Sequence, residues 1–320
     1  MHAEGQAENA RSTSSALQHL GQSVRRLRKE EWGNPLGYLF IAPALILYLV
    51  FNFWVLIRGF LMAFTNYEFL VPGSDWNWDG LRNFQEAFHD RFFGEAIRVS
   101  LQYIAMLLPS LVVLSLLTAV AIYRVRHGAA FLRWLVYLPV IIPISVSMLL
   151  WSQLYNNQYG LIDTMLQAFG LHNPPNWLGS THTALLSVAA ASLWHSFGFP
   201  TLLFLVGLYG ISTDLYEAAA VDGANAWQQF WHVTLPSLRP TFALVIVLNI
   251  GLLYGTQEIL LLTGGGPANA TQTVGFYIYQ VAFTEGNLRL GYAASLSLIV
   301  GIVLMGVSFA TLRSLRREPA

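Results

Sequence analysis

The chain has 320 residues and no net charge; 55% of its residues are hydrophobic, 11% are charged, and its mean hydropathy is +0.49. A soluble domain of this length would hardly tolerate that composition. The zero net charge gives no indication of a nucleic-acid partner. The absence of cysteine excludes disulfides, a thiol nucleophile and cysteine metal ligands. Lys29 is the single lysine, which excludes a phosphate-binding loop of the G-x-x-x-x-G-K-[ST] type.

The first 36 residues are polar and contain a basic cluster at Arg25–Lys29. We predict disorder over residues 1–16 and a surface helix over residues 16–31. The apolar run that follows is too long for a signal peptide, and further apolar runs come after it. We therefore expect this run to be retained as a first membrane helix.

Six apolar segments each approach the ~20 residues that a bilayer-spanning helix needs. They predict an all-α polytopic membrane protein with six transmembrane helices. The expected spans are Tyr38–Phe60, Val99–Tyr123, Trp134–Gln153, Ala184–Tyr209, Thr241–Leu262 and Leu290–Leu312. Prolines inside these spans or at their edges predict kinks, because neighbouring helices can satisfy the freed carbonyl groups.

Arginine and lysine lie unequally on the two sides of these segments. Twelve fall before the first span, in the loop 124–133, in the segment 213–240 and in the tail, against four in the other loops. Because positive charges are retained on the cytoplasmic side, this asymmetry predicts that both termini and the segment 213–240 are cytoplasmic.

The loops on the other side contain acids and glycines that resemble ligand sites only superficially. Asp75, Asp79, Asp90 and Glu95 lack the D-x-D-x-D-G spacing of a calcium loop, so we expect a solvated loop and no metal site. The run Thr263–Pro267 has glycines but no lysine, and it predicts a sharp turn rather than a phosphate cradle.

A polar stretch, residues 213–240, separates the fourth and fifth apolar segments, and we call it the elbow. Asp214, with Glu217 three residues later, predicts a helix start by a variant of the capping box. Asn225 and Gln228 predict the start of a second helix. Gly223, which lies between the two expected helices, interrupts the helical pattern. Two short helices hinged at a glycine are therefore expected, with Pro236 ending the second.

The elbow carries the motif that identifies a family. Glu217-Ala218-Ala219, then Gly223, then Val233-x-Leu235-Pro236 match the E-A-A, G, I-x-L-P pattern. The chain thereby resembles inner-membrane permease subunits of binding-protein-dependent ABC importers. The flanking Asp222, Ala224 and residues 234–240 resemble the carbohydrate and glycerol-phosphate branch, of the maltose type. The resemblance covers most of the chain from Gly37 onward.

The resemblance implies a domain organisation and a set of partners. Residues 1–36 would be a cytoplasmic segment, 37–313 a six-span importer domain and 314–320 a cytoplasmic tail, in a bacterial or archaeal cell membrane. A second permease, two copies of an ATPase and an extracytoplasmic solute-binding protein would complete the transporter. ATP and magnesium would bind the ATPase, so this chain would have no cofactor and no enzymatic activity. The residues expected to contact the ATPase are Glu217, Ala218, Ala219, Asp222, Gly223, Ala224, Leu235 and Pro236.

Polar residues inside spans are candidates for contact with a small-molecule substrate, since such residues are costly to insert. The candidates are Asn249, Tyr254, Thr256, Gln257 and Glu258 in the fifth segment and Trp194 and His195 in the fourth. Asn249 and Thr256 are seven residues apart and are expected on one helix side. Gly251 and Gly255 are spaced for close helix packing. Glu258 has two interpretations, a substrate or gating role or simple access to water, and His195 is interpreted either as an interhelical hydrogen bond or as a ligand.

Other classes of function remain open at the level of sequence. A permease of the same family for a non-sugar solute is the alternative within the importer class. An intramembrane enzyme finds little support, because H-E-x-x-H and G-x-S-x-G motifs are absent. A membrane assembly scaffold is the further alternative, and copurification with an ATPase would separate it from an importer.

Overall fold

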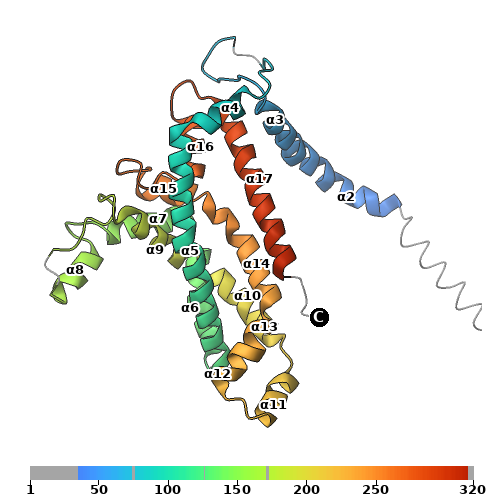
Figure 1. Ribbon diagram of the computed structural model, residues 1–320, viewed down its shortest axis with the longest axis vertical. Helices are drawn as coiled ribbons and strands as arrows, with labels where there is room; N and C mark the ends of the chain where they lie inside the picture. Colours follow the sequence, from blue (N-terminus) through green and yellow to red (C-terminus); the bar gives the residue numbers. More distant parts are fainter. Residues whose placement is uncertain (1–34, 74–75, 126, 171–172, 316–320) are drawn as a thin grey trace, which may run out of the picture. The chain divides into compact units, whose positions relative to one another are not determined.

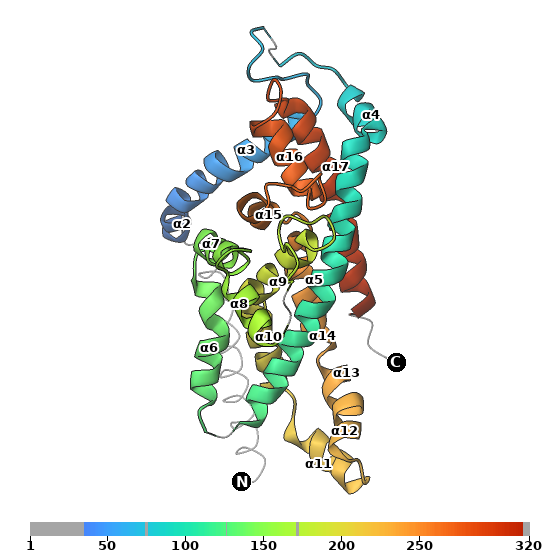
Figure 2. The ribbon, with the colours of Figure 1, turned by 90° about the vertical axis from the view of Figure 1, so that its left-hand side faces the viewer.

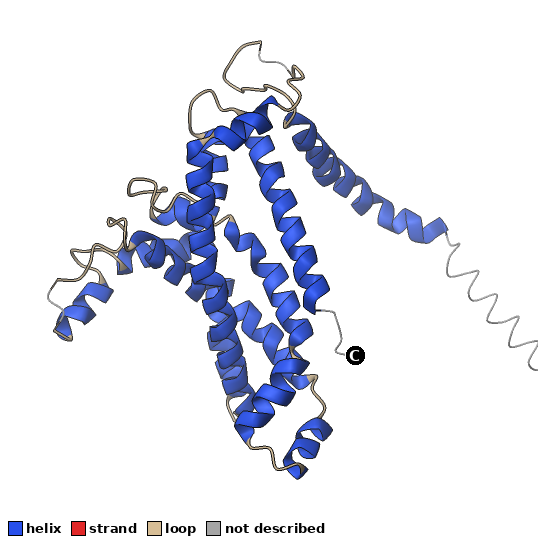
Figure 3. Cartoon of the chain, viewed as in Figure 1, coloured by secondary structure: helices blue, strands red, loops and turns tan. Residues whose placement is uncertain are grey.

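The computed structural model describes residues 35–73, 76–125, 127–170 and 173–315. The described chain is helical apart from turns, loops and one isolated bridge between Thr65 and Trp78 (Figure 3). The all-α prediction is confirmed. The predicted disorder over residues 1–16, the predicted helix over 16–31 and most of the tail lie outside the described residues.

The chain divides into two units, Met1–Gly59 and Phe60–Ala320, which are described separately. In the first, α2 (Pro35–Tyr48), the π-helical segment η1 (Leu49–Phe53) and α3 (Trp54–Met62) follow one another without a break. The apolar run Tyr38–Met62 buries none of its side chains within the protein. A helix that is apolar on every side is suited to lipid, as predicted for the first span.

The second unit is built around α5 (Arg91–Arg124), a single helix of 34 residues (Figures 1 and 2). Its first turns pack with α16 (Val274–Phe283) and α17 (Leu290–Leu315), its middle with α9 (Ala184–Ser196), and its last turns with α10 (Gly198–Tyr209). The predicted span, Val99–Tyr123, begins eight residues too late. The helix starts earlier because the Asp90 side chain accepts hydrogen bonds from the backbone N–H groups of Phe92 and Phe93.

Two of the predicted spans, the third and the fourth, are broken helices in the structure. Helices α6 (Ala129–Ile141) and α7 (Ile144–Leu154) meet at 94°, so the third predicted span is not one continuous helix. Pro143 lies at this break, where it cannot donate a backbone hydrogen bond. Helices α9 and α10 meet at 47°. Both bends lie near prolines of the predicted spans, Pro143 and Pro200, where kinks were predicted.

The fifth predicted span is also interrupted. Helix α14 (Arg239–Asn249) passes into a 3₁₀ turn, η3 (Ile250–Leu253), and a separate helix α15 (Thr256–Leu262) follows. Gly255 joins them with a φ of +48°, a conformation that ends a right-handed helix. The expectation of one helix over Thr241–Leu262 is therefore wrong.

The described residues contain three helices long and apolar enough to cross a membrane, and up to six spans if each bent pair counts as one. The elbow lies at one end of the second unit, and α16 lies with α4 (Arg82–His89) at the opposite end, here called the α16 end (Figures 1 and 2). The predicted turn at Thr263–Pro267 is confirmed, with positive φ at Gly264 and Gly265. The short helix α8 (Leu161–Ala168) follows α7.

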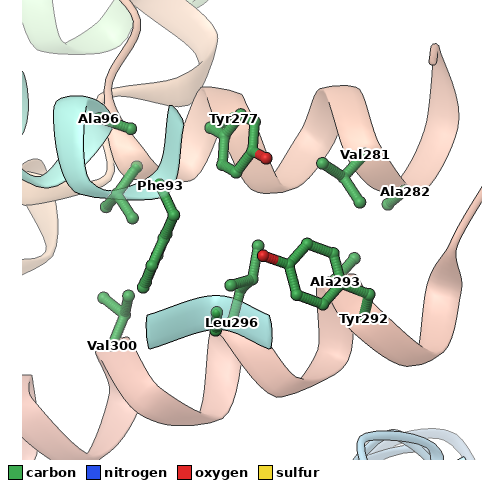
Figure 4. Close-up of a cluster of buried hydrophobic side chains, with 11 residues drawn as sticks. Phe93, Ala96, Tyr277, Val281, Ala282, Tyr292, Ala293, Leu296 and Val300 are labelled. Atoms are coloured by element: carbon green, nitrogen blue, oxygen red, sulfur yellow. The ribbon is translucent and has the colours of Figure 1, made fainter. Parts of the chain in front are cut away.

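At the α16 end a buried cluster joins α4, α5, α16 and α17. Phe93 and Ala96 of α5 face Tyr277 of α16 and Leu296 of α17 across this cluster (Figure 4). The hydroxyl groups of Tyr277 and of Tyr292, which belongs to α17, point into the space between α16 and α17 (Figure 4). Apolar packing therefore fixes the end of the unit that lies farthest from the elbow.

Candidate functional site: the elbow and the interior polar residues

The first elbow helix, α11 (Thr213–Val221), starts two residues earlier than predicted. Ser212 is its N-cap, and the Ser212 hydroxyl accepts a hydrogen bond from the Asp214 backbone N–H at 3.2 Å. The prediction that Asp214 caps this helix with Glu217 is wrong. Serine and aspartate are about equally good caps, and the choice depends on which of them has extended backbone angles.

Gly223 is the hinge between the two elbow helices, as predicted. Its φ is +83°, and its N–H donates to the carbonyl of Ala220 at 3.0 Å. The next N–H, of Ala224, donates to the carbonyl of Ala219 at 2.9 Å. These bonds satisfy carbonyl groups that the helix end would otherwise leave free, an arrangement in which glycine takes the left-handed position.

The second elbow helix starts with the predicted capping box. The Asn225 side chain accepts from the backbone N–H groups of Trp227 and Gln228, and the Gln228 side chain accepts from the Asn225 N–H at 2.8 Å. The helix runs through α12 (Ala226–Gln229), the π-helical segment η2 (Phe230–Thr234) and α13 (Leu235–Ser237). The predicted end at Pro236 is one residue too early, because proline is accepted in the first turn of α13.

The predicted coupling residues divide into an exposed set and a half-buried set. Glu217, Ala218, Asp222 and Gly223 are exposed, whereas Ala219, Ala224, Leu235 and Pro236 are half-buried. A cavity of about 320 Å³ lies along the hinge, between α11 and the start of the second helix. Its lining includes Ala219, Asp222, Gly223, Ala224, Gln228 and His232. The small side chains leave the backbone of the hinge open to a partner.

The elbow also exposes large apolar side chains beside this cavity. Val221 is 88% exposed and Trp227 is 68% exposed, and Leu215 and Trp231 are about half exposed. The rings of Trp227 and Trp231 meet edge to face, with centroids 5.6 Å apart. Exposed apolar groups in a polar segment are typical of a protein interface.

A hydrogen bond that the sequence did not predict joins the two elbow helices where the elbow meets the spans. The Tyr216 and Thr234 hydroxyl groups lie 2.9 Å apart and join α11 to η2. Leu235 packs against the buried cluster formed by α5, α10 and α14. Sequence spacing gave no sign of the pair, because the two residues belong to different helices on either side of the hinge. The elbow is consequently attached to the spans at its base and exposed at its tip.

The interior candidates lie on separate elements. Asn249 ends α14 and donates to the Val245 carbonyl of its own helix at 2.8 Å. Thr256 begins α15, so the expectation that Asn249 and Thr256 share one helix side is wrong. The Tyr254 carbonyl accepts from the Thr273 hydroxyl at 2.8 Å, which fixes the break against the turn before α16.

Gln257 and Glu258 are adjacent in sequence but differ in exposure. Gln257 is exposed, whereas Glu258 is 8% exposed, so the interpretation that Glu258 reaches water is wrong. The predicted close packing at the two glycines is found at Gly255 but not, among the described residues, at Gly251. An added Cβ at Gly251 would meet nothing within 4 Å, whereas one at Gly255 would lie 2.9 Å from the Tyr103 ring.

Trp194 and His195 lie where α9 meets α7. The Trp194 ring meets Trp151 edge to face at 5.9 Å, and His195 Nδ1 lies 3.2 Å from the Ser147 hydroxyl. The histidine therefore makes the interhelical hydrogen bond that was one of its two interpretations. These two residues and the fifth-segment candidates are not joined by any hydrogen bond among the described residues.

Asp90 at the α16 end forms a cluster that sequence reasoning missed. Asp90 Oδ2 accepts from the Tyr277 hydroxyl at 2.6 Å and from the Tyr292 hydroxyl at 2.7 Å. Nearby, Arg289 donates both of its terminal nitrogens to Glu86, at 2.6 and 2.7 Å. The expectation of a solvated loop is thus wrong for Asp90. We call these five residues the Asp90 cluster.

Electrostatics at this cluster favour the ionised carboxylates. Burial raises the pKa of Asp90, but the hydrogen bonds from Tyr277, Tyr292 and two backbone amides outweigh burial and hold the pKa below its ordinary value. The hydrogen bond from Arg289 lowers the pKa of Glu86 against a smaller opposing effect of burial. Among the described residues, no group of three His, Cys, Asp or Glu side chains is placed to hold a metal ion.

The apolar helices and the exposed polar elbow define a helical membrane protein. Residues 87–316 match the family described as binding-protein-dependent transport system inner membrane component, and the chain belongs to that family. It is therefore a multi-pass inner-membrane permease subunit of an ABC importer and is not itself an ATPase.

Relatives and a solved structure agree with this assignment. The chain is 31% identical to a trehalose/maltose transport system permease protein, MalF, of Thermococcus litoralis, over 88% of this chain and 95% of the relative. It is 31% identical to the sn-glycerol-3-phosphate permease UgpA of Agrobacterium fabrum, over 85% and 92%. It also resembles a chain of a bacterial alginate ABC transporter, solved with its alginate pentasaccharide-bound periplasmic protein, with a TM-score of 0.74, 25% identity and coverages of 90% and 96%.

Proposed function

We propose that this permease imports a sugar, an oligosaccharide or a related polyol phosphate, and that its elbow couples the import to a separate ATPase. The observation that carries the proposal is the hinged elbow, exposed at its tip and attached at its base. The relatives named for trehalose, maltose and glycerol phosphate, and the alginate transporter, support a substrate rich in hydroxyl groups.

The elbow is suited to transmit binding energy rather than to perform chemistry. The exposed tip of the elbow, which includes Glu217 and Trp227, binds in a cleft of the ATPase. Movement of the cleft displaces both elbow helices together, because the Tyr216–Thr234 hydrogen bond joins them. The half-buried Leu235 passes the movement to the cluster of α5, α10 and α14. In this proposal ATP and magnesium bind the ATPase, and this chain holds no cofactor. Alternating access then follows from movement of the spans around the substrate.

The partners in this proposal are a second permease, an ATPase dimer and an external solute-binding protein. Gln257 and the half-buried Asn249, Tyr254, Thr256, Trp194 and His195 supply hydrogen-bonding groups and rings for a sugar, whereas Glu258 is enclosed in this conformation. The elbow and both termini are placed in the cytoplasm, following the arginine asymmetry.

Uptake by the reconstituted transporter tests the proposal. Proteoliposomes containing this chain and its copurifying partners are supplied with binding protein and a panel of labelled sugars and polyol phosphates. ATP-dependent uptake of a panel member is expected. Uptake of only a non-sugar solute would contradict the substrate class, and failure to copurify with any ATPase would contradict the proposed coupling through the elbow.

Charge reversal at the tip tests the coupling role. Glu217→Ala removes an exposed ion pair with the ATPase, worth about 0.2–1 kcal/mol, and should lower coupled transport slightly. Glu217→Lys should lower it more, because the contact becomes repulsive. Since Glu217 is exposed, neither change should alter the thermal stability of the permease. Equal and full transport by both variants would contradict the proposed contact.

A further inference from the structure

A second cavity, of about 180 Å³, lies where the elbow meets the ends of α5 and α10. Its apolar wall includes Val120 of α5, Leu208 of α10 and Phe230 of η2. Its polar lining includes Arg124, Tyr216 and Thr234. The cavity is several times the ~30 Å³ that a water molecule occupies in the liquid, and one side of it is too apolar to hold a water cluster.

Arg124 gives this cavity an unpaired positive charge. It is the last residue of α5 and is exposed, and it makes no ion pair or hydrogen bond with any other described residue. Its position at a helix C-terminus is favourable for a cation. A guanidinium group matches the geometry of a phosphate, to which it can donate two parallel hydrogen bonds.

The side chains around the cavity are of the kinds found at the depth of lipid headgroups. Tyr123 and Tyr209 lie beside it with ring centroids 5.3 Å apart, and Tyr209 is 56% exposed. Such tyrosines are enriched at the boundary between hydrocarbon and water. Along the same helix, the exposed side chains Val113 and Leu117 continue an apolar surface toward the interior of the membrane.

We propose that this cavity binds an anionic phospholipid from the leaflet on the elbow's side. The phosphate pairs with Arg124, and the upper part of an acyl chain lies against Val120, Leu208 and Phe230. A free phosphate ion gains only the arginine and meets the unfavourable end of the α5 dipole, whereas a lipid also gains the apolar wall. The cavity lies between elbow and spans, so its occupant stiffens the joint through which the elbow acts.

Lipid retention tests the binding without relying on the transport assignment. The purified complex, in detergent with phosphatidylglycerol and phosphatidylcholine at equal concentration, is analysed by native mass spectrometry. The wild type and Arg124→Lys should retain one more phosphatidylglycerol than Arg124→Gln. Arg133→Gln is the matched control, because Arg133 donates to the Ala129 carbonyl outside the cavity. Ala226→Leu, which fills the cavity without changing charge, should also lose the lipid.

Two results would overturn the proposal. One is equal retention of phosphatidylglycerol by Arg124→Gln, Ala226→Leu and Arg133→Gln. The other is displacement of the lipid by millimolar glycerol phosphate, which would identify a site for a soluble anion. In nanodiscs, replacing phosphatidylcholine with a phosphatidylglycerol mixture should raise ATPase activity at least threefold in the wild type and Arg133→Gln but not in Arg124→Gln. If only this last arm fails, the lipid is bound but does not stiffen the joint.

Discussion

Gly223 holds a backbone conformation that side chains with a Cβ rarely adopt, yet the space around it is open. Its φ is +83°, and an added Cβ would meet no atom within 4 Å. Substitution therefore strains the backbone without a collision. The cost of the left-handed conformation is about 1–2 kcal/mol for ordinary residues and is smaller for asparagine.

This difference predicts a graded series at the hinge. Gly223→Asn should keep most coupled transport, Gly223→Ala should keep less, and Gly223→Val should lose most of it, because a β-branched residue fits this conformation worst. The measurement is ATP-driven uptake in proteoliposomes, with assembly checked by gel filtration. The hinge would not matter to coupling if Gly223→Val transported as well as Gly223→Asn.

Gly255 and Gly251 form a natural pair of test and control. At Gly255 the φ is +48° and a Cβ would lie 2.9 Å from the Tyr103 ring, whereas at Gly251 nothing lies within 4 Å. Gly255→Ala should lower the melting temperature of the purified complex by several degrees, from roughly 1–3 kcal/mol of strain. Gly251→Ala should leave it unchanged. Equal effects would restore the close-packing interpretation suggested by their spacing.

The Asp90 cluster joins elements that are far apart in sequence, and its removal should separate them. Asp90→Ala removes the N-cap of α5 and leaves the Tyr277 and Tyr292 hydroxyl groups without their acceptor, and it should cost on the order of 2–3 kcal/mol of stability. Tyr277→Phe removes one of these bonds and should cost less. Melting temperatures at pH 7 measure both, and exposed His89→Ala, on the neighbouring helix, is the control.

The same cluster predicts a dependence on pH. Because the folded state lowers the pKa of Asp90, the ionised form stabilises the fold fully above the unfolded pKa of about 3.9. That contribution is lost as the pH falls through the lower, folded value. The stability difference between wild type and Asp90→Asn should stay constant from pH 7 to 5 and shrink below about pH 4. A difference that shrank between pH 7 and 5 would contradict the lowered pKa.

Local patterns in the sequence predicted elements well where the deciding contacts were local. The box of Asn225 and Gln228 and the hinge at Gly223 depend only on near neighbours, and both are present. The prediction of Asp214 as the cap of α11 was wrong, since Ser212 satisfies the same local pattern. The Asp90 cluster could not be predicted, because Tyr277 and Tyr292 lie about two hundred residues away along the chain.

The broken spans were missed for a different physical reason. Hydropathy measures transfer into lipid and is insensitive to direction, so a helix that turns through 94° at Pro143 has the same hydropathy as a straight one. The break at Gly255 was missed for the same reason, because the apolar run continues on both sides of this glycine. Proline and glycine in such runs indicated irregularity, but its extent depends on what the neighbouring helices can satisfy.

At the scale of the whole molecule, the proposed topology has the elbow in the cytoplasm and the α16 end outside. The chain has no cysteine, so single cysteines report their own accessibility. Ala220→Cys in the elbow and Thr284→Cys at the α16 end are both at exposed positions. A membrane-impermeant maleimide should label Thr284→Cys in intact cells and Ala220→Cys only after the membrane is opened. The reverse pattern would invert the proposed topology.

The unbroken length of α5 has a mechanical consequence. At 1.5 Å per residue its 34 residues extend for about 51 Å, well beyond a hydrocarbon layer of about 30 Å. One end is anchored by Asp90, and the other carries Arg124 beside the elbow. For a rod of that length, a tilt of about 10° about one end displaces the other by roughly 9 Å. Small rotations of this helix about its anchored end therefore produce large displacements at the end where the elbow is attached.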